Sequence, residues 1–116
     1  MATLSKILLS DSTSGRGTLV VPTATAGQDI HTAVAGGSDI DEIWLWASNA
    51  HTVAVTLTLE WGGVTSPDDL LKTVIQPNET LLIAPGLLLN GGLDVAAFAS
   101  TASVVTIFGY VNRITA

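Results

Sequence analysis

The chain has 116 residues, of which 47% are hydrophobic and only 12% are charged, and its formal net charge is −6. This length suits one domain with a single core, and the charged share is about half of the roughly 25% found in a typical soluble domain. The four basic residues are scattered, which argues against a nucleic-acid backbone or an anionic membrane as partner, and the lack of cysteine excludes disulfides and thiolate metal sites.

Residues 1–16 have the composition of a flexible arm. A short apolar stretch at 7–9 is followed by a run rich in Ser, Thr and Gly. We expect this arm to extend from a domain spanning residues 17–116 and to dock on a neighbouring subunit. The apolar stretch is too short for a signal peptide, and no segment reaches the ~20 apolar residues of a membrane-spanning helix. We therefore expect a protein that stays in the cytosol in which it is made, or leaves by cell lysis.

From residue 17 onward, short β-patterned runs alternate with turn residues. About eight such runs with short connections predict an all-β, single-domain β-sandwich with antiparallel, jelly-roll-like topology. One helical turn is an alternative at residues 66–69, where Ser66 and Pro67 precede two aspartates. The predicted strands cover residues 18–22, 28–34, 40–49, 51–61, 70–76, 80–84, 93–100 and 103–114.

The two runs from residue 40 to residue 61 have the clearest strand pattern. In residues 40–49, aliphatic side chains alternate with Trp44 and Trp46, so both indoles point to one face. The turn-like sequence "SNAHT" predicts a hairpin between this run and residues 51–61. The second run alternates an aliphatic face with a face of Thr and Ala. Because that face costs little to desolvate, we expect it to pack flat against a copy of itself or a lattice of other subunits.

The last predicted strand, residues 103–114, is apolar on both faces, as expected for a central strand. Gly109 inside it predicts a bulge or the close approach of another backbone. We expect Tyr110, like Phe98 on the preceding run, to fill the core or a subunit interface.

Few residue patterns point to chemistry. His31 and His51 fall at predicted strand edges and are interpreted as surface or turn residues, although a triad of Ser, His and Asp is defined by geometry and not by order. The acids within residues 38–42 and 66–69 are interpreted as solvated loop carboxylates, with a calcium site as the alternative. We therefore expect neither enzymatic activity nor a cofactor.

The three tryptophans are the candidate site residues. Trp44, Trp46 and Trp61 are expected to fill the core or a subunit interface, where large amphipathic side chains are favoured. The alternative is an aromatic platform for a carbohydrate, with Trp61 on a strand paired to the one that carries Trp44 and Trp46.

The segments "GRGTLVVPTATAGQDIHTA", "DEIWLWASNAHTVAVTLTLEWGG", "LLIAPGLLLNGGLDVAAFAS" and "TIFGYVNRI" resemble a group of small virion proteins of tailed bacteriophages. The similarity covers residues 15–114 and lies in the layout: few charges, short strands, a tryptophan-rich pair of runs and a final "GYVNRI". It implies a structural protein assembled into the virion in the host cytoplasm. Such proteins include capsid decoration (cement) proteins, which form trimers on the major capsid protein or another virion protein. The alternative is a receptor- or glycan-binding module of a tail or fibre.

Overall fold

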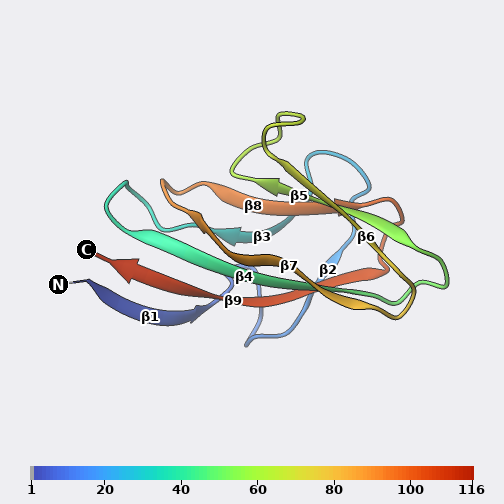
Figure 1. Cartoon of the computed structure of the whole chain (residues 1–116), viewed down its shortest axis with the longest axis horizontal. Helices are drawn as coiled ribbons and strands as arrows, with labels where there is room; N and C mark the ends of the chain where they lie inside the picture. Colours follow the sequence, from blue (N-terminus) through green and yellow to red (C-terminus); the bar gives the residue numbers. More distant parts are fainter. Residues whose placement is uncertain (1) are drawn as a thin grey trace.

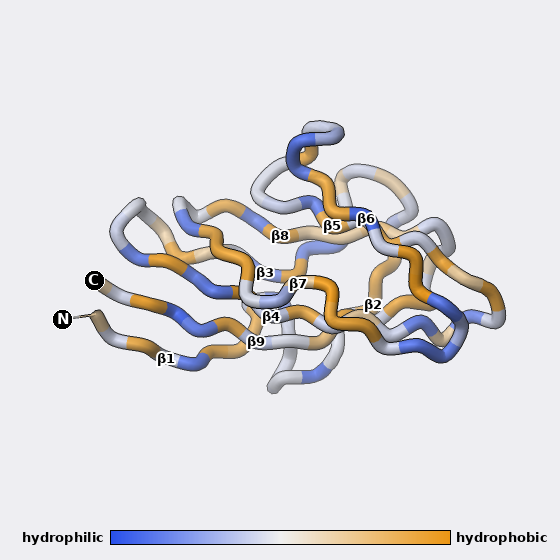
Figure 2. Tube along the Cα trace, viewed as in Figure 1, coloured by the Kyte–Doolittle hydropathy of each residue, from blue (hydrophilic) through white to orange (hydrophobic). Residues whose placement is uncertain are grey.

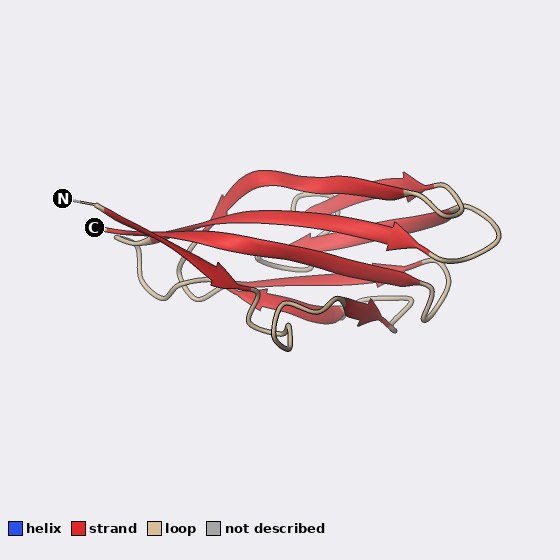
Figure 3. Ribbon diagram, turned by 90° about the horizontal axis from the view of Figure 1, so that it is seen from below, coloured by secondary structure: helices blue, strands red, loops and turns tan. Residues whose placement is uncertain are grey.

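In the part of the chain that the structure describes, nine β-strands form two antiparallel sheets that pack face to face (Figures 1 and 3). The computed structural model describes residues 2–116 and measures 48 × 28 × 20 Å. Both termini lie side by side at one end of the sandwich (Figure 1), because Thr3 pairs with Thr115. None of residues 2–116 belongs to a helix with the length and hydropathy needed for a membrane span. The strands are β1 (Thr3–Leu8), β2 (Thr18–Val20), β3 (Gln28–Thr32), β4 (Ile40–Asn49), β5 (Val55–Trp61), β6 (Leu70–Ile75), β7 (Thr80–Leu89), β8 (Asp94–Ala99) and β9 (Val105–Thr115).

The order of the strands is that of a jelly roll, which confirms the predicted fold class. Sheet A has the order β1-β9-β4-β7, with β2 also paired to β9, and sheet B has the order β3-β8-β5-β6. Thus β3 pairs with β8, β4 with β7 and β5 with β6, as in one long hairpin rolled over on itself. The ninth strand arises because the first jelly-roll strand is split: β1 and β2 pair with successive parts of β9.

The core lies between the sheets and follows the period-two alternation of the long strands. Figure 2 shows how hydrophobic and hydrophilic residues are distributed along the strands. In β4, Ile43, Leu45 and Ala47 are buried while the residues between them keep partial exposure. In β5, Val55, Leu57 and Leu59 meet them from the other sheet. The buried aliphatic residues that complete the core are Leu9, Val20, Ile30, Ile75, Ala84, Val95, Ala97, Ala99, Val105, Ile107 and Val111.

The predicted hairpin between residues 40–49 and 51–61 is wrong. β4 has β7 and β9 on its two edges, and β5 has β6 and β8, so the connection at residues 50–54 crosses from one sheet to the other. Asn49 fixes this crossing: its Nδ2 donates to the carbonyl oxygens of Val53 (3.1 Å) and Ile75 (3.0 Å), and its Oδ1 accepts from the His51 amide (2.9 Å). The chain bends at residues 51–53, but Ser48 and Asn49 still belong to β4 and β5 begins only at Val55. Pairing was decided by the strands that occupy each edge.

The predictions for four further segments can be compared with the structure, and not all of them are confirmed. Residues 3–8, placed by the sequence analysis in a flexible arm, form β1 at the edge of sheet A. Residues 66–69 form a turn and no helix. β7 continues past residue 84 to Leu89, through two register shifts that an edge strand tolerates. Gly109 confirms the predicted close approach of a backbone, since a Cβ there would collide with the carbonyl oxygen of Trp44.

Candidate functional site

The outward side of sheet A carries a broad, almost uncharged surface. Register places side chains from β1, β2, β9, β4 and β7 on it, because directly opposed residues point to the same side. Half of the large hydrophobic residues exposed in the described part of the chain lie here, and these are 42–65% exposed. We call this surface the apolar face. Its apolar members are Leu4, Leu8, Leu19, Ile40, Trp44, Trp46, Leu82, Pro85, Leu88, Phe108, Tyr110 and Ile114.

Three aromatic rings form the centre of the apolar face. Trp44 and Trp46 are two residues apart on β4, and Tyr110 lies opposite Trp44 on β9. The ring centroids are 6.1–6.5 Å apart and the ring planes differ by 12–26°. Gly86 on β7 makes room for Trp44, since a Cβ at Gly86 would lie 2.9 Å from its ring. The result is a partly exposed group of nearly parallel rings.

Two residues of opposite charge lie in one row on the apolar face. Lys6, Asn112 and Glu42 are cross-strand neighbours on β1, β9 and β4. Hydrogen bonds to Glu42 Oε1 from Asn112 Nδ2 (3.0 Å) and Trp44 Nε1 (2.8 Å) lower the pKa of Glu42. The Lys6 ammonium lies 4.8 Å from the centroid of the Tyr110 ring, a cation–π contact. The face is therefore neutral in a chain whose net charge is −6.

Trp61 is separated from the other two tryptophans. It ends β5 in sheet B, and its Nε1 donates to the carbonyl oxygen of Leu88 at 3.3 Å. The structure therefore brings together Trp44 and Trp46 but not Trp61, because β4 and β5 belong to different sheets. The third ring of the group is Tyr110 on β9.

The Thr and Ala face of residues 51–61 is covered in part by the chain itself, which corrects the expectation that another subunit covers it. Thr58 and Glu60 each retain 2% exposure. The Glu60 carboxylate accepts hydrogen bonds from Thr25 Oγ1 and from the Gly27 amide, both at 2.7 Å. The segment that supplies these donors also bonds β8, where the Ala99 amide donates to the carbonyl of Pro22 (3.2 Å).

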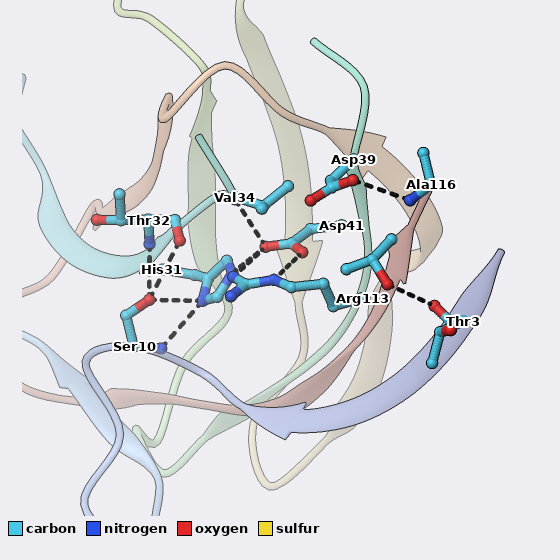
Figure 4. Close-up of polar contacts among 10 residues, drawn as sticks. Thr3, Ser10, His31, Thr32, Val34, Asp39, Asp41, Arg113 and Ala116 are labelled. Carbon is cyan, nitrogen blue, oxygen red and sulfur yellow. Dashed lines mark hydrogen bonds and ion pairs between the residues drawn. The ribbon is translucent and has the colours of Figure 1, made fainter. Parts of the chain in front are cut away.

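Four polar side chains at the end of the sandwich near the chain termini form a second group, the polar cluster of Ser10, His31, Asp41 and Arg113 (Figure 4). Asp41 and His31 are 0% and 1% exposed. Arg113 Nε and one terminal nitrogen donate to the two oxygens of Asp41 at 2.8 and 3.0 Å. Burial alone would raise the pKa of Asp41, but the hydrogen bonds from Arg113 and His31 together lower it. The interpretation of His31 as a surface residue is thus wrong.

The polar cluster has the connectivity of a catalytic triad, with Arg113 as a further partner of the aspartate. Ser10 Oγ lies 2.8 Å from His31 Nδ1, and His31 Nε2 lies 2.8 Å from Asp41 Oδ2. The Ser10 amide also donates to Nδ1 at 3.0 Å, so Nδ1 is the acceptor and Nε2–H donates to Asp41. Arg113 pairs with Asp41 and the imidazole is buried, so both groups are held in contacts inside the fold. The cluster joins the end of β1 to β3, β4 and β9.

Two of the remaining acidic side chains accept hydrogen bonds from backbone amides. Within residues 2–116 no three His, Asp or Glu side chains converge in a metal-binding arrangement. Asp39 accepts from the Ala116 amide (2.9 Å), and Asp69 accepts from the Thr65 amide (3.1 Å). On sheet B, Asp29 and Asp94 line a surface pocket of about 270 Å³ beside the buried Glu60.

No protein-family model matches the chain, and neither curated proteins nor solved structures give a match. The alternation in residues 40–49 predicts the two central indoles of the apolar face, but the leucines around them were not predicted. Leu4 and Leu8 fell in the expected arm, and Leu88 lay beyond the predicted end of its strand. The alternation of Leu4, Lys6 and Leu8 was the signal that could have indicated β1.

Proposed function

We propose that this protein is a non-enzymatic structural component of a tailed-bacteriophage virion, namely a capsid decoration protein that assembles as a trimer and stabilises the head. The observation that carries the proposal is the apolar face. Monomeric soluble proteins rarely expose contiguous apolar patches above a few hundred Å², and larger ones mark interaction sites. The resemblance of residues 15–114 to small virion proteins supplies the setting.

The energetic scale suits a stable assembly. A standard interface hides about 800 Å² per partner, of which more than half is apolar. At ~25 cal/mol per Å², this burial contributes about 10 kcal/mol of gross stabilisation per partner, a magnitude comparable with the ~4–15 kcal/mol cost of association. The polar cluster also supports a non-enzymatic role, because His31 and Asp41, which could serve in acid–base catalysis, are buried inside the fold.

The alternative is a receptor- or glycan-binding module of a tail or fibre. It is favoured by one observation, the nearly parallel and partly exposed rings of Trp44, Trp46 and Tyr110. Aromatic faces of this kind provide flat apolar area with polar edges, which is the chemistry that a sugar ring requires.

Co-sedimentation tests the proposal. Purified protein is mixed with heads of the phage that encodes it, prepared without the protein. We expect saturable binding at a fixed ratio to the major capsid protein, and heads that withstand a higher temperature once loaded. Absence of binding at micromolar concentration would refute the decoration role. A change in tryptophan fluorescence with host cell-surface glycans, and none with heads, would support the alternative.

A further inference from the structure

We propose that other copies of this chain cover the apolar face, so that the outward sides of sheet A meet inside the homo-oligomer, an inference that rests on the assembly role proposed above. The virion partner then binds elsewhere on the sandwich. Three properties of the face favour a copy of the chain over a different protein: its charge, its dimensions and the arrangement of its side chains.

Charge is the first property. With a net charge of −6, two copies repel one another through most of their surface. Among the outward-pointing strand residues of sheet A, Lys6 and Glu42 are the ionisable pair, and their formal charges cancel. Two copies can therefore approach through this face without net repulsion. A strongly acidic or basic partner surface would find no complement here.

The dimensions of the face match a standard subunit contact. Four columns of strands about 4.8 Å apart and the ten residues of β4 at about 3.3 Å each give roughly 600 Å² in projection. Side-chain relief raises the accessible area toward the about 800 Å² per partner of a standard interface. The sheets A of other copies have the same dimensions, and in a trimer two neighbouring copies share the cover of each face.

The side chains are arranged as in a subunit contact. Trp44, Trp46 and Tyr110 occupy the centre, and leucines on the edge strands β1 and β7 flank them. Binding energy in interfaces concentrates in central aromatic anchors, with surrounding contacts that exclude water. Stacked sheets pack about 10 Å apart, which lets such anchors interdigitate.

The chain offers a closely matched pair of variants to test the proposal. Leu8→Lys places a charge on the apolar face, and Val74→Lys places the same charge on the outer side of sheet B. The two positions are 54% and 55% exposed. Both lie on edge strands, and each has a lysine two residues earlier on the same face, Lys6 or Lys72. Any difference between the variants therefore reports on the face and not on the charge.

Sedimentation equilibrium over a range of concentrations gives the readout. We expect wild type and Val74→Lys to have a mass that is a multiple of 11.9 kDa, three copies for the trimer, and Leu8→Lys to associate at least tenfold more weakly. Leu82→Lys, from the opposite edge of the face, repeats the test if Leu8→Lys does not give the wild-type circular dichroism spectrum. A wild-type monomer at all concentrations, or equal association of all variants, would overturn the proposal.

Comparison with head binding separates this inference from the proposed function. A wild-type oligomer that is lost in Leu8→Lys but does not bind heads leaves the inference standing and refutes the decoration role. A monomer that binds heads refutes the inference and the trimer of the proposed function, and retains only the decoration role. A monomer without head affinity refutes both.

Discussion

The polar cluster and the apolar face share strand β4 and use it in opposite ways. Its inward residue Asp41 is fully buried and bonded to His31 and Arg113, whereas its outward residues Trp44 and Trp46 stay partly exposed. The groups capable of acid–base chemistry thus hold the fold together, and chemically inert rings and leucines face outward. The contrast supports the assembly role proposed above, and it can be tested by changing each region in turn.

The largest effect is expected for Asp41→Asn. The variant leaves the guanidinium of Arg113 without its counter-ion, and breaking a buried pair costs about 3–5 kcal/mol. We expect about 3 kcal/mol, at the low end, because the side chain of Arg113 is 30% exposed. Urea unfolding measures the loss, with Asp68→Asn at an exposed turn as the control. Equal stability of the two variants would show that the cluster does not support the fold.

Acid should remove the same contribution gradually. The hydrogen bonds from Arg113 and His31 outweigh burial and hold the pKa of Asp41 below its ordinary value of 3.8. A lowered folded-state pKa stabilises the protein fully above the unfolded value, and the stabilisation is lost as pH falls through the folded value. The gap in unfolding free energy between wild type and Asp41→Asn should therefore narrow below pH 3.8. A gap that stays constant down to pH 2 would contradict this assignment.

Ser10→Ala is expected to have a smaller effect. The hydroxyl contacts His31 Nδ1 (2.8 Å) and accepts from the Thr32 amide (3.0 Å), but Ser10 is exposed and water can replace it. We expect a loss of about 1 kcal/mol. Hydrolysis of an activated ester should be the same for wild type and variant, since the cluster is structural. Hydrolysis that disappears with the serine hydroxyl would make the cluster a catalytic site.

The sequence predicted the fold class and most of the core-facing side chains, but it did not predict all of the strand pairing. Alternation in β4 and β5 predicted which side chains enter the core, because a period of two leaves one arrangement that buries the aliphatic residues. Strand pairing is non-local, and the sequence "SNAHT" fits a hairpin as well as a crossing between sheets. The hydrogen bond from Asn49 to the carbonyl of Ile75, which helps to fix the crossing, depends on where β6 lies. No local pattern reveals that position.

Prediction of the site was limited in the same way. Trp44 and Trp46 were placed on one face by their spacing alone, whereas Tyr110 joins them only through the register of β9 against β4. The polar cluster draws residues from positions 10 to 113, and its members are ordinary until the fold brings them together. Glu60 belongs to the Thr and Ala face of residues 51–61, and its burial depends on two donors from the loop that precedes β3.

The smallest effect is expected for Trp61→Phe. This variant tests whether the subunit contact ends at the apolar face. Trp61→Phe removes a 3.3 Å hydrogen bond to the Leu88 carbonyl, worth about 0.5 kcal/mol, and keeps the aromatic area. We expect oligomer mass to be unchanged, whereas Trp46→Ala, which removes a central anchor, should weaken association. Emission from the Trp61→Phe protein should still shift to the red on dilution, since Trp44 and Trp46 become solvated as copies separate. If Trp61→Phe weakens association as much as Trp46→Ala does, the contact extends around the edge of the sandwich and sheet A alone does not define it.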